Sequence, residues 1–214
     1  MEIAMKTTIG KLKMLLGKQV TLEGWVHTIR AQKRMQFLIL RGHDGKVQCL
    51  VDSKTQPELA ATVAALPRES TVRIYGKVAA NPQVSLGGIE VFIESIKTFS
   101  TSGPSLPIDL SSPTTSGVEP RMDWRFLDLR RPESRLIFEI QTEAEWAMRQ
   151  YWRQERFIEI HTPKMMATAS ETGAELFSID YFGGQAYLAQ SPQFYKQMAM
   201  ASGFDRVFEI RSEE

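Results

Sequence analysis

Gln193 and Lys196 are the residues of this sequence whose types and spacing most directly indicate a binding site. They lie three positions apart in a segment that Ser191-Pro192 opens and Gly203 closes, as is typical of a helix. Residues three apart on a helix project from one face, and a lysine ammonium there can bind a carboxylate. The same pattern also fits a surface lysine and a serine that only caps the helix.

Arg30, Phe37 and Gln48 indicate a different chemistry. Recognition of single-stranded RNA needs aromatic faces for stacking, polar groups that read base edges, and basic groups that hold phosphates. These three residues supply one of each, and the stretch Gln32 to Gln36 adds positive charge. The alternatives are a phenylalanine buried in a core and an ordinary solvated turn, and both are open from the residues alone.

Glu171 lies in the short polar segment Ala169-Ser-Glu-Thr-Gly173. A small loop of this kind can close over a ligand, although its glutamate can equally be a solvent-exposed acid.

Other kinds of site are disfavoured by the composition. The single cysteine, Cys49, and the three histidines lack the spacing of a metal site, so no structural zinc is expected. The longest apolar runs are too short to cross a bilayer, and the N-terminus lacks a cleavable signal pattern. We therefore expect a cytoplasmic protein.

Charge is distributed unequally, although the formal net charge is only +1. Residues 1–98 hold 14 Lys and Arg against 8 Asp and Glu, whereas the remainder hold 12 against 17. A basic domain suits a polyanionic partner, but on charge alone a solvated surface is an equally good interpretation.

The elements that must position these residues fall into two groups. Apolar alternation predicts five strands in the first 98 residues, with a helix at Glu58 to Leu66 between the third and fourth. The predicted strands are Val20 to Val26, Phe37 to Arg41, Val47 to Val51, Val72 to Val78 and Ile89 to Ile96. This order is typical of an OB-fold barrel.

Residues 99–120 are the predicted hinge, because 15 of these 22 residues are Ser, Thr, Pro or Gly. Beyond it, helical spacing predicts a long helix from Glu133 to Gln154. Strands are predicted at Phe157 to His161 and Arg206 to Ile210, with a turn at Gly183-Gly184 between two more β-prone runs. The sequence thus predicts an α+β protein.

Four segments, in this order, resemble the aspartyl-tRNA synthetases, in particular the archaeal and eukaryotic branch. They are Gly24-Trp-Val-His-Thr-Ile-Arg30, Arg125-Phe-Leu-Asp-Leu-Arg130, Phe157-Ile-Glu-Ile-His-Thr-Pro-Lys164 and Gln190-Ser-Pro-Gln-Phe-Tyr-Lys-Gln197. The resemblance implies an OB-fold anticodon-binding domain at 1–98, a hinge at 99–120, and at 121–214 the first part of a class II synthetase catalytic domain with an antiparallel sheet.

For the barrel, the resemblance implies that tRNA(Asp) is a partner. Phe37 would stack on an anticodon base, Gln48 would read a base, and Arg30 would contact a phosphate or base. Whether tRNA(Asn) is also a substrate depends on discrimination at one anticodon base and stays open.

For the second domain, the resemblance implies that Lys196 faces the β-carboxylate of L-aspartate. An amide in that place would leave the ammonium desolvated and unpaired, which selects against asparagine. Gln193 and Ser191 would hold the amino acid, and Glu171 would approach its ammonium group.

The resemblance also implies ATP as a substrate. Arg211 would be the catalytic residue that holds the α-phosphate, and Glu213 would contact the adenine amino group. Attack of the aspartate carboxylate builds charge on that phosphate, which a guanidinium and Mg²⁺ stabilise. In this chain Arg211 follows the strand directly, whereas the family has a few further residues there.

A homodimer is a further implication, formed through the long helix and the strand that ends at Pro163. The helix carries Trp146, Tyr151 and Trp152 on more than one side, which fits a partner, although packing within one subunit explains it nearly as well. The third signature motif and the Mg²⁺ ligands are expected beyond Glu214. We therefore expect an N-terminal half with no metal ligands, inactive alone.

Two alternatives accompany this interpretation. An asparaginyl-tRNA synthetase shares the architecture, but Lys196 counts against it because an amide substrate does not need that charge. A non-catalytic tRNA-binding paralogue would fold and bind RNA without activating an amino acid.

Overall fold

The computed structural model describes residues 5–32, 34–103, 105–110, 116–167, 177–189 and 191–211. The chain divides into two compact units, Met1–Pro107 and Ile108–Glu214. This division falls inside residues 99–120, whose role as a hinge stays a prediction.

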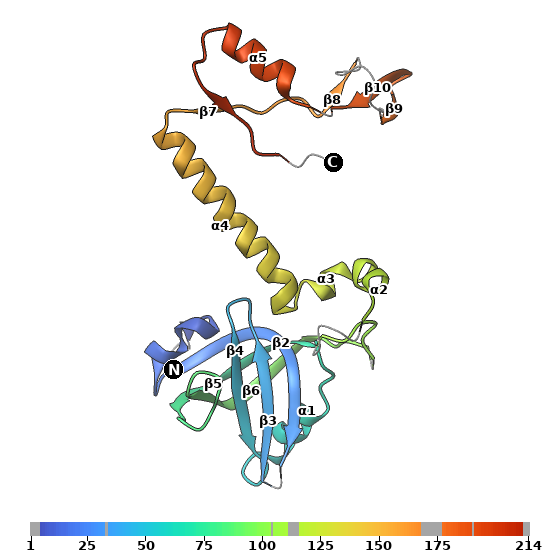
Figure 1. The fold of residues 1–214 in the computed structure, drawn as a ribbon. Helices are drawn as coiled ribbons and strands as arrows, with labels where there is room; N and C mark the ends of the chain where they lie inside the picture. The colour runs from blue at the N-terminus through green and yellow to red at the C-terminus, as the bar shows by residue number, and fades with distance from the viewer. Residues whose placement is uncertain are drawn as a thin grey trace. The chain divides into compact units, whose positions relative to one another are not determined.

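The first unit is a closed sheet built by the predicted strands (Figure 1). Its strands are β1 (Met5–Lys6), β2 (Gln19–Ala31), β3 (Met35–Arg41), β4 (Lys46–Asp52), β5 (Thr71–Ala80) and β6 (Ile89–Ser100). Their order is β1-β2-β3-β4-β6-β5, and an additional β2–β5 pairing closes the sheet. The OB-fold prediction is confirmed, with the short β1 as an unpredicted addition.

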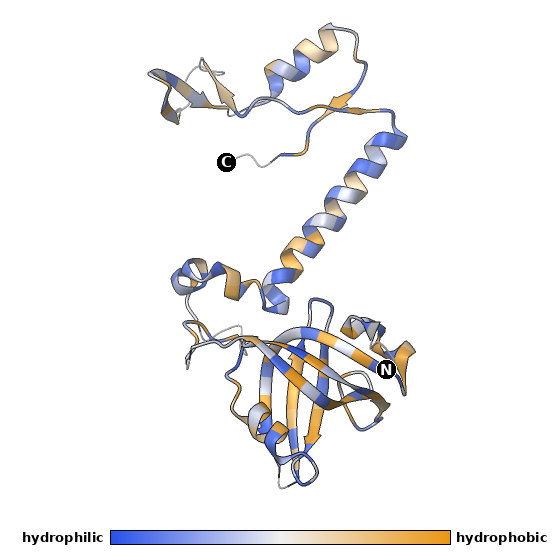
Figure 2. Cartoon of the chain, turned by 180° about the vertical axis from the view of Figure 1, so that it is seen from behind, coloured by the Kyte–Doolittle hydropathy of each residue, from blue (hydrophilic) through white to orange (hydrophobic). Residues whose placement is uncertain are grey.

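The barrel core follows from the period-two pattern of the strands. Inward residues such as Leu38, Leu40 and Cys49 are fully buried, and the outward residues between them are not. Two helices complete the core: η1 (Ile9–Leu15) and α1 (Pro57–Ala64) each contribute apolar side chains to it. Figure 2 shows the hydrophobic residues concentrated in the strands of this unit.

The second unit contains four helices and two small sheets within its described residues. Its helices are α2 (Val118–Asp123), α3 (Arg125–Asp128), α4 (Pro132–Gln154) and α5 (Gln193–Ala201). An antiparallel sheet of order β8-β10-β9 comprises Met165–Met166, Gly184–Leu188 and Ser178–Tyr181; β7 (Ile158–Glu159) pairs in parallel with β11 (Val207–Phe208). The long helix is confirmed, whereas α2, α3 and β8 were not predicted.

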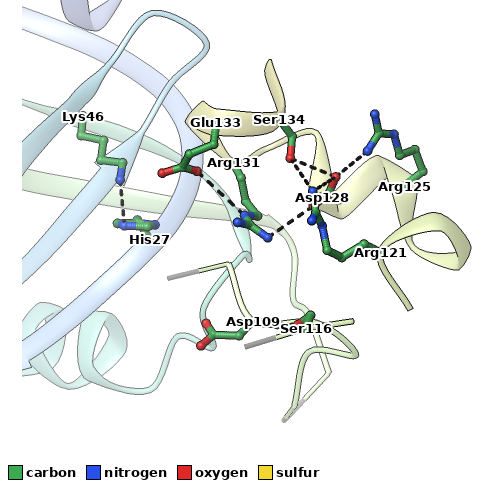
Figure 3. A network of polar contacts seen from close by, with 10 residues as sticks. All are labelled: His27, Lys46, Asp109, Ser116, Arg121, Arg125, Asp128, Arg131, Glu133 and Ser134. Carbon is green, nitrogen blue, oxygen red and sulfur yellow. Dashed lines mark hydrogen bonds and ion pairs between the residues drawn. The ribbon is translucent and has the colours of Figure 1, made fainter. Parts of the chain in front are cut away.

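A buried carboxylate holds the unpredicted helices together. Asp128 is fully buried and accepts hydrogen bonds from Arg121 at 2.8 Å, Arg125 at 2.6 Å and Ser134 at 3.0 Å (Figure 3). Arg131 adds an ion pair at 3.4 Å. Burial alone would raise the pKa of Asp128, but the bonds from Arg121 and Ser134 outweigh it and lower the pKa. This network fixes the turns from α2 to α4.

Within the described ranges, no helix combines the length and apolar composition that crossing a membrane requires.

Candidate functional site

Arg30, Phe37 and Gln48 line one groove on the outer face of the barrel, with a volume of about 650 Å³. The register explains why they meet: Arg30 pairs with Phe37 across β2 and β3, and Ile39 pairs with Gln48 across β3 and β4. The structure therefore brings together the three residues selected from the sequence. Their roles toward RNA stay predictions.

Phe37 is half-buried and does not belong to the barrel core. Its neighbours Leu38 and Leu40 point inward and are fully buried, and alternation along β3 turns Phe37 to the opposite face. The Phe37 side chain therefore lines the groove, the place where a stacking residue would have to lie.

Glu90 was not selected from the sequence, yet it anchors the groove. It is 8% exposed and accepts hydrogen bonds from the amide nitrogens of Gln48 at 3.3 Å and Asn81 at 2.9 Å. These bonds orient the Gln48 amide, whose oxygen stays available as an acceptor. The sequence feature that could have identified Glu90 is an acidic residue within an otherwise apolar strand segment.

His27 and Lys46 also line the groove and were not selected. The Lys46 ammonium donates to His27 Nε2 at 3.0 Å (Figure 3). Burial lowers the pKa of His27 to about 4, and the positive charges of Lys46 and Arg41 act in the same direction. The imidazole is therefore neutral at pH 7 and can accept the lysine hydrogen bond.

The depressed pKa of His27 predicts a pH-dependent stability. Between about pH 6.5 and 4 the unfolded chain binds a proton at His27 that the folded chain excludes, so stability falls as pH falls through this window. Because the side chain is partly exposed, we expect a loss of only about 1–2 kcal/mol. Urea unfolding at both ends of the window would measure it. A His27→Gln chain should lack this component, and identical pH dependence in both chains would contradict the assignment.

Ser191, Gln193 and Lys196 lie at the start of α5. The helix begins at Gln193, two residues later than predicted, with Pro192 at the N-cap. The Ser191 hydroxyl still accepts from the Gln193 N–H at 3.2 Å, so it satisfies one donor of the first turn. Gln193 is exposed and Lys196 is half-buried. Among the described residues, no ion pair of Lys196 is found.

Arg211 lies beside the segment that enters α5. Its guanidinium donates to the Ala189 carbonyl at 2.9 Å and approaches the Thr162 hydroxyl at 3.5 Å. Ala189 precedes Ser191 by two residues, so these contacts hold Arg211 next to the chain that carries the candidate amino-acid residues.

Glu209 stabilises this region, and the sequence did not reveal it. Its side chain is 1% exposed and accepts bonds from the Thr162 N–H at 3.0 Å, the Thr162 hydroxyl at 2.9 Å and Lys164 at 2.8 Å. Burial alone would raise the pKa of Glu209, but these hydrogen bonds outweigh it and lower the pKa to about 2. The carboxylate therefore links the segment before Pro163 to the strand before Arg211.

Glu171 and Glu213, the two remaining predicted site residues, lie outside the described residues. Their proposed contacts with the amino acid and with adenine therefore stay predictions.

Both units match known families. Residues 20–99 match the OB-fold nucleic acid binding domain, and residues 117–213 match the tRNA synthetases class II (D, K and N). Two curated relatives are Aspartate–tRNA(Asp/Asn) ligases, from Methanococcus maripaludis at 45% identity and Methanopyrus kandleri at 44%. Each similarity covers 91% of this chain, but only 44% and 45% of the respective relative. The chain thus spans less than half the length of these relatives.

Solved structures similar to this chain are also tRNA synthetases. Asparaginyl-tRNA synthetase from Pyrococcus horikoshii, complexed with asparaginyl-adenylate, matches 98% of this chain and 48% of its own, with a TM-score of 0.88 and 30% identity. A putative aspartyl-tRNA synthetase from Leishmania major Friedlin matches 100% of this chain and 45% of its own, with a TM-score of 0.84 and 30% identity. The chain is therefore similar over nearly its whole length to tRNA synthetases, and residues 117–213 match the class II family of the D, K and N group.

Proposed function

We propose that this chain provides the anticodon-binding domain and the amino-acid pocket of an aspartate–tRNA ligase. The enzyme joins L-aspartate to the α-phosphate of ATP, forming aspartyl-adenylate and releasing pyrophosphate. It then transfers the aspartyl group to tRNA(Asp), releasing AMP, with tRNA(Asn) as an additional candidate. The observation that carries the assignment to aspartate is Lys196, whose ammonium forms no ion pair with the described part of the chain. The relatives named Aspartate–tRNA(Asp/Asn) ligase support the same assignment.

The chemistry assigned to this chain is positioning and charge stabilisation. Lys196 binds the β-carboxylate of aspartate, and Gln193 and Ser191 hold the rest of the amino acid. Arg211 holds the ATP α-phosphate, where charge builds as the aspartate α-carboxylate attacks. Its contacts with Ala189 and Thr162 orient the guanidinium, and no covalent enzyme intermediate is required.

Mg²⁺ would add charge neutralisation at the ATP phosphates. Among the described residues around Arg211, Glu209 is an acid whose type could bind Mg²⁺. Its carboxylate oxygens, however, already accept hydrogen bonds from Thr162 and Lys164. We therefore assign the Mg²⁺ ligands to the part of the relatives that this chain does not cover. A tRNA ligase of this kind would act in the cytoplasm.

We also propose a homodimer, because nearly all side chains of α4 are at least partly exposed. Of the 23 residues of this helix, Ser134 alone is buried. Figure 2 shows hydrophobic residues in the N-terminal half of this helix, where Leu136, Ile137, Phe138 and Ile140 are 48–61% exposed. Several exposed apolar side chains on one helix are typical of an interface, here with a second copy and with the rest of the catalytic domain.

Phe37→Ala tests the anticodon assignment in the chain itself. Loss of one stacking platform should weaken binding of an aspartate-anticodon RNA stem-loop by about 1–3 kcal/mol, measured by fluorescence anisotropy. Phe92→Ala is the matched control, because Phe92 is a strand phenylalanine, 43% exposed, that does not line the groove. Equal affinities for the two variants would show that Phe37 does not stack on RNA.

The second candidate function is that of an asparaginyl-tRNA synthetase, since the structure of such an enzyme is among those similar to this chain. ATP–pyrophosphate exchange by a full-length protein that contains this chain separates the two. Exchange with asparagine and none with aspartate would overturn our assignment.

A further inference from the structure

Lys46 and His27 form a polar pair in the groove that the roles assigned to Arg30, Phe37 and Gln48 leave unexplained. We propose that Lys46, positioned by His27, binds a backbone phosphate of the RNA strand in this groove. The inference rests on the proposed RNA-binding function and extends it to a second, sequence-independent contact.

A bulge in β2 places His27 beside Lys46. Val26 pairs with Leu40 and Thr28 pairs with Ile39, so the register passes over His27 between two consecutive residues of β3. An extra residue in a strand redirects its side chain, and such bulges are frequent next to binding sites. Here the redirected imidazole reaches the Lys46 ammonium at 3.0 Å.

The partner of Lys46 is neutral, so the lysine charge is not compensated. Within the described ranges Lys46 forms no ion pair with a carboxylate. The acid that lines the same groove, Glu90, is instead engaged by the amides of Gln48 and Asn81. Nearby, Glu69 is paired with Arg41. A half-buried ammonium held by a neutral acceptor is therefore ready to receive an anion.

The groups around His27 support a neutral imidazole rather than a second cation. Lys46, Arg41 and Arg68 each disfavour its protonation and Glu69 opposes them, while burial has the largest effect. Arg68 also donates to the His27 carbonyl at 3.2 Å, which fixes the bulge.

The position of Lys46 in the sheet indicates a nucleotide other than the stacked one. Phe37 pairs with Leu50, and Leu50 lies four residues along β4 from Lys46. At about 3.4 Å per residue, this separates the two sites by about 14 Å along the strand. A base on Phe37 and a phosphate on Lys46 would thus belong to different nucleotides of one strand.

The salt dependence of RNA binding by the chain tests this phosphate contact. For single-stranded contacts, log K falls with log salt by about 0.7 per phosphate neutralised. Lys46→Met should therefore lower the slope by about 0.7 and weaken binding severalfold, equally for an aspartate-anticodon stem-loop and one with a scrambled loop. Lys46→Arg should retain the slope. Lys77→Met, at an exposed lysine of β5 outside the groove, is the charge-matched control.

Each outcome decides the matter once thermal melting shows that the variants are folded. An unchanged slope in Lys46→Met, with normal binding by the parent chain, overturns the phosphate contact and leaves the RNA-binding function standing. A loss confined to the aspartate anticodon means that Lys46 reads a base, which also overturns it. Absence of RNA binding by the parent chain would overturn both proposals.

Discussion

Lys196→Ala, in a full-length protein that contains this chain, is expected to lower kcat/KM for aspartate in ATP–pyrophosphate exchange by roughly 10²- to 10³-fold. The reason is that removing one partner of a desolvated charge pair leaves the substrate β-carboxylate buried and unpaired, at a cost of about 2–5 kcal/mol. Binding of tRNA through the barrel should be unaffected. Near-normal activation of aspartate by the Lys196→Ala variant would show that Lys196 does not bind the substrate carboxylate.

Two further variants sharpen this test. Gln197→Ala changes the exposed neighbour of Lys196, which lies about 100° further round α5, and should leave exchange unchanged. Lys196→Arg keeps the charge but changes its geometry, so it should retain selection against asparagine while losing rate. If Gln197→Ala were as damaging as Lys196→Ala, the loss would report the stability of the helix instead of substrate recognition.

The barrel could be predicted from the sequence because its strands are half-buried and alternate with period two. The same alternation places Phe37 on the outer face of the barrel, although the residue type alone did not decide between the core and the outer face. What alternation could not predict was contact between distant strands. Gln48 and Glu90 are 42 residues apart and meet because β4 and β6 pair in parallel, a topology that no local pattern specifies.

The second unit was predicted less completely, for a related reason. The long helix has a strong period, whereas α2 and α3 have six and four residues and are stabilised by the ion pairs of buried Asp128. Thr162 and Glu209 are 47 residues apart and meet through the β7–β11 pairing. Neither charge cluster has a spacing that distinguishes it from solvated surface residues.

The bulge at His27 shows why one part of the groove escaped prediction. The apolar alternation of Val20, Leu22 and Val26 ends at Val26, and the next apolar residue that packs against the core, Ile29, is out of phase with it. No glycine or proline follows Val26 to indicate an extra residue, and only the pairing of β2 with β3 places the bulge at His27. The predicted three-residue site was therefore a subset of the groove that the fold builds.

Arg41→Met is expected to destabilise the barrel by about 3–5 kcal/mol, the largest stability effect that we predict in this unit. Arg41 donates to both Glu69 oxygens, at 2.9 Å and 2.6 Å, with side chains 9% and 2% exposed. The guanidinium also lies 5.5 Å from the ring centre of Trp25. Its removal leaves the Glu69 carboxylate buried without its principal cation. Native-state hydrogen exchange at core amides such as Leu38 would measure the loss in the barrel alone.

The double variant Arg41→Met, Glu69→Leu distinguishes a costly unpaired charge from a pair that itself stabilises the fold. Burying two ions is expensive, and apolar replacements of similar volume are often neutral or stabilising. We therefore expect the double variant to recover most of the stability that Arg41→Met loses. The recovery should be incomplete, because the double variant also lacks the contact between the Arg41 guanidinium and the Trp25 ring. If the double variant were as unstable as the single one, the pair would be a net source of barrel stability, contrary to this expectation.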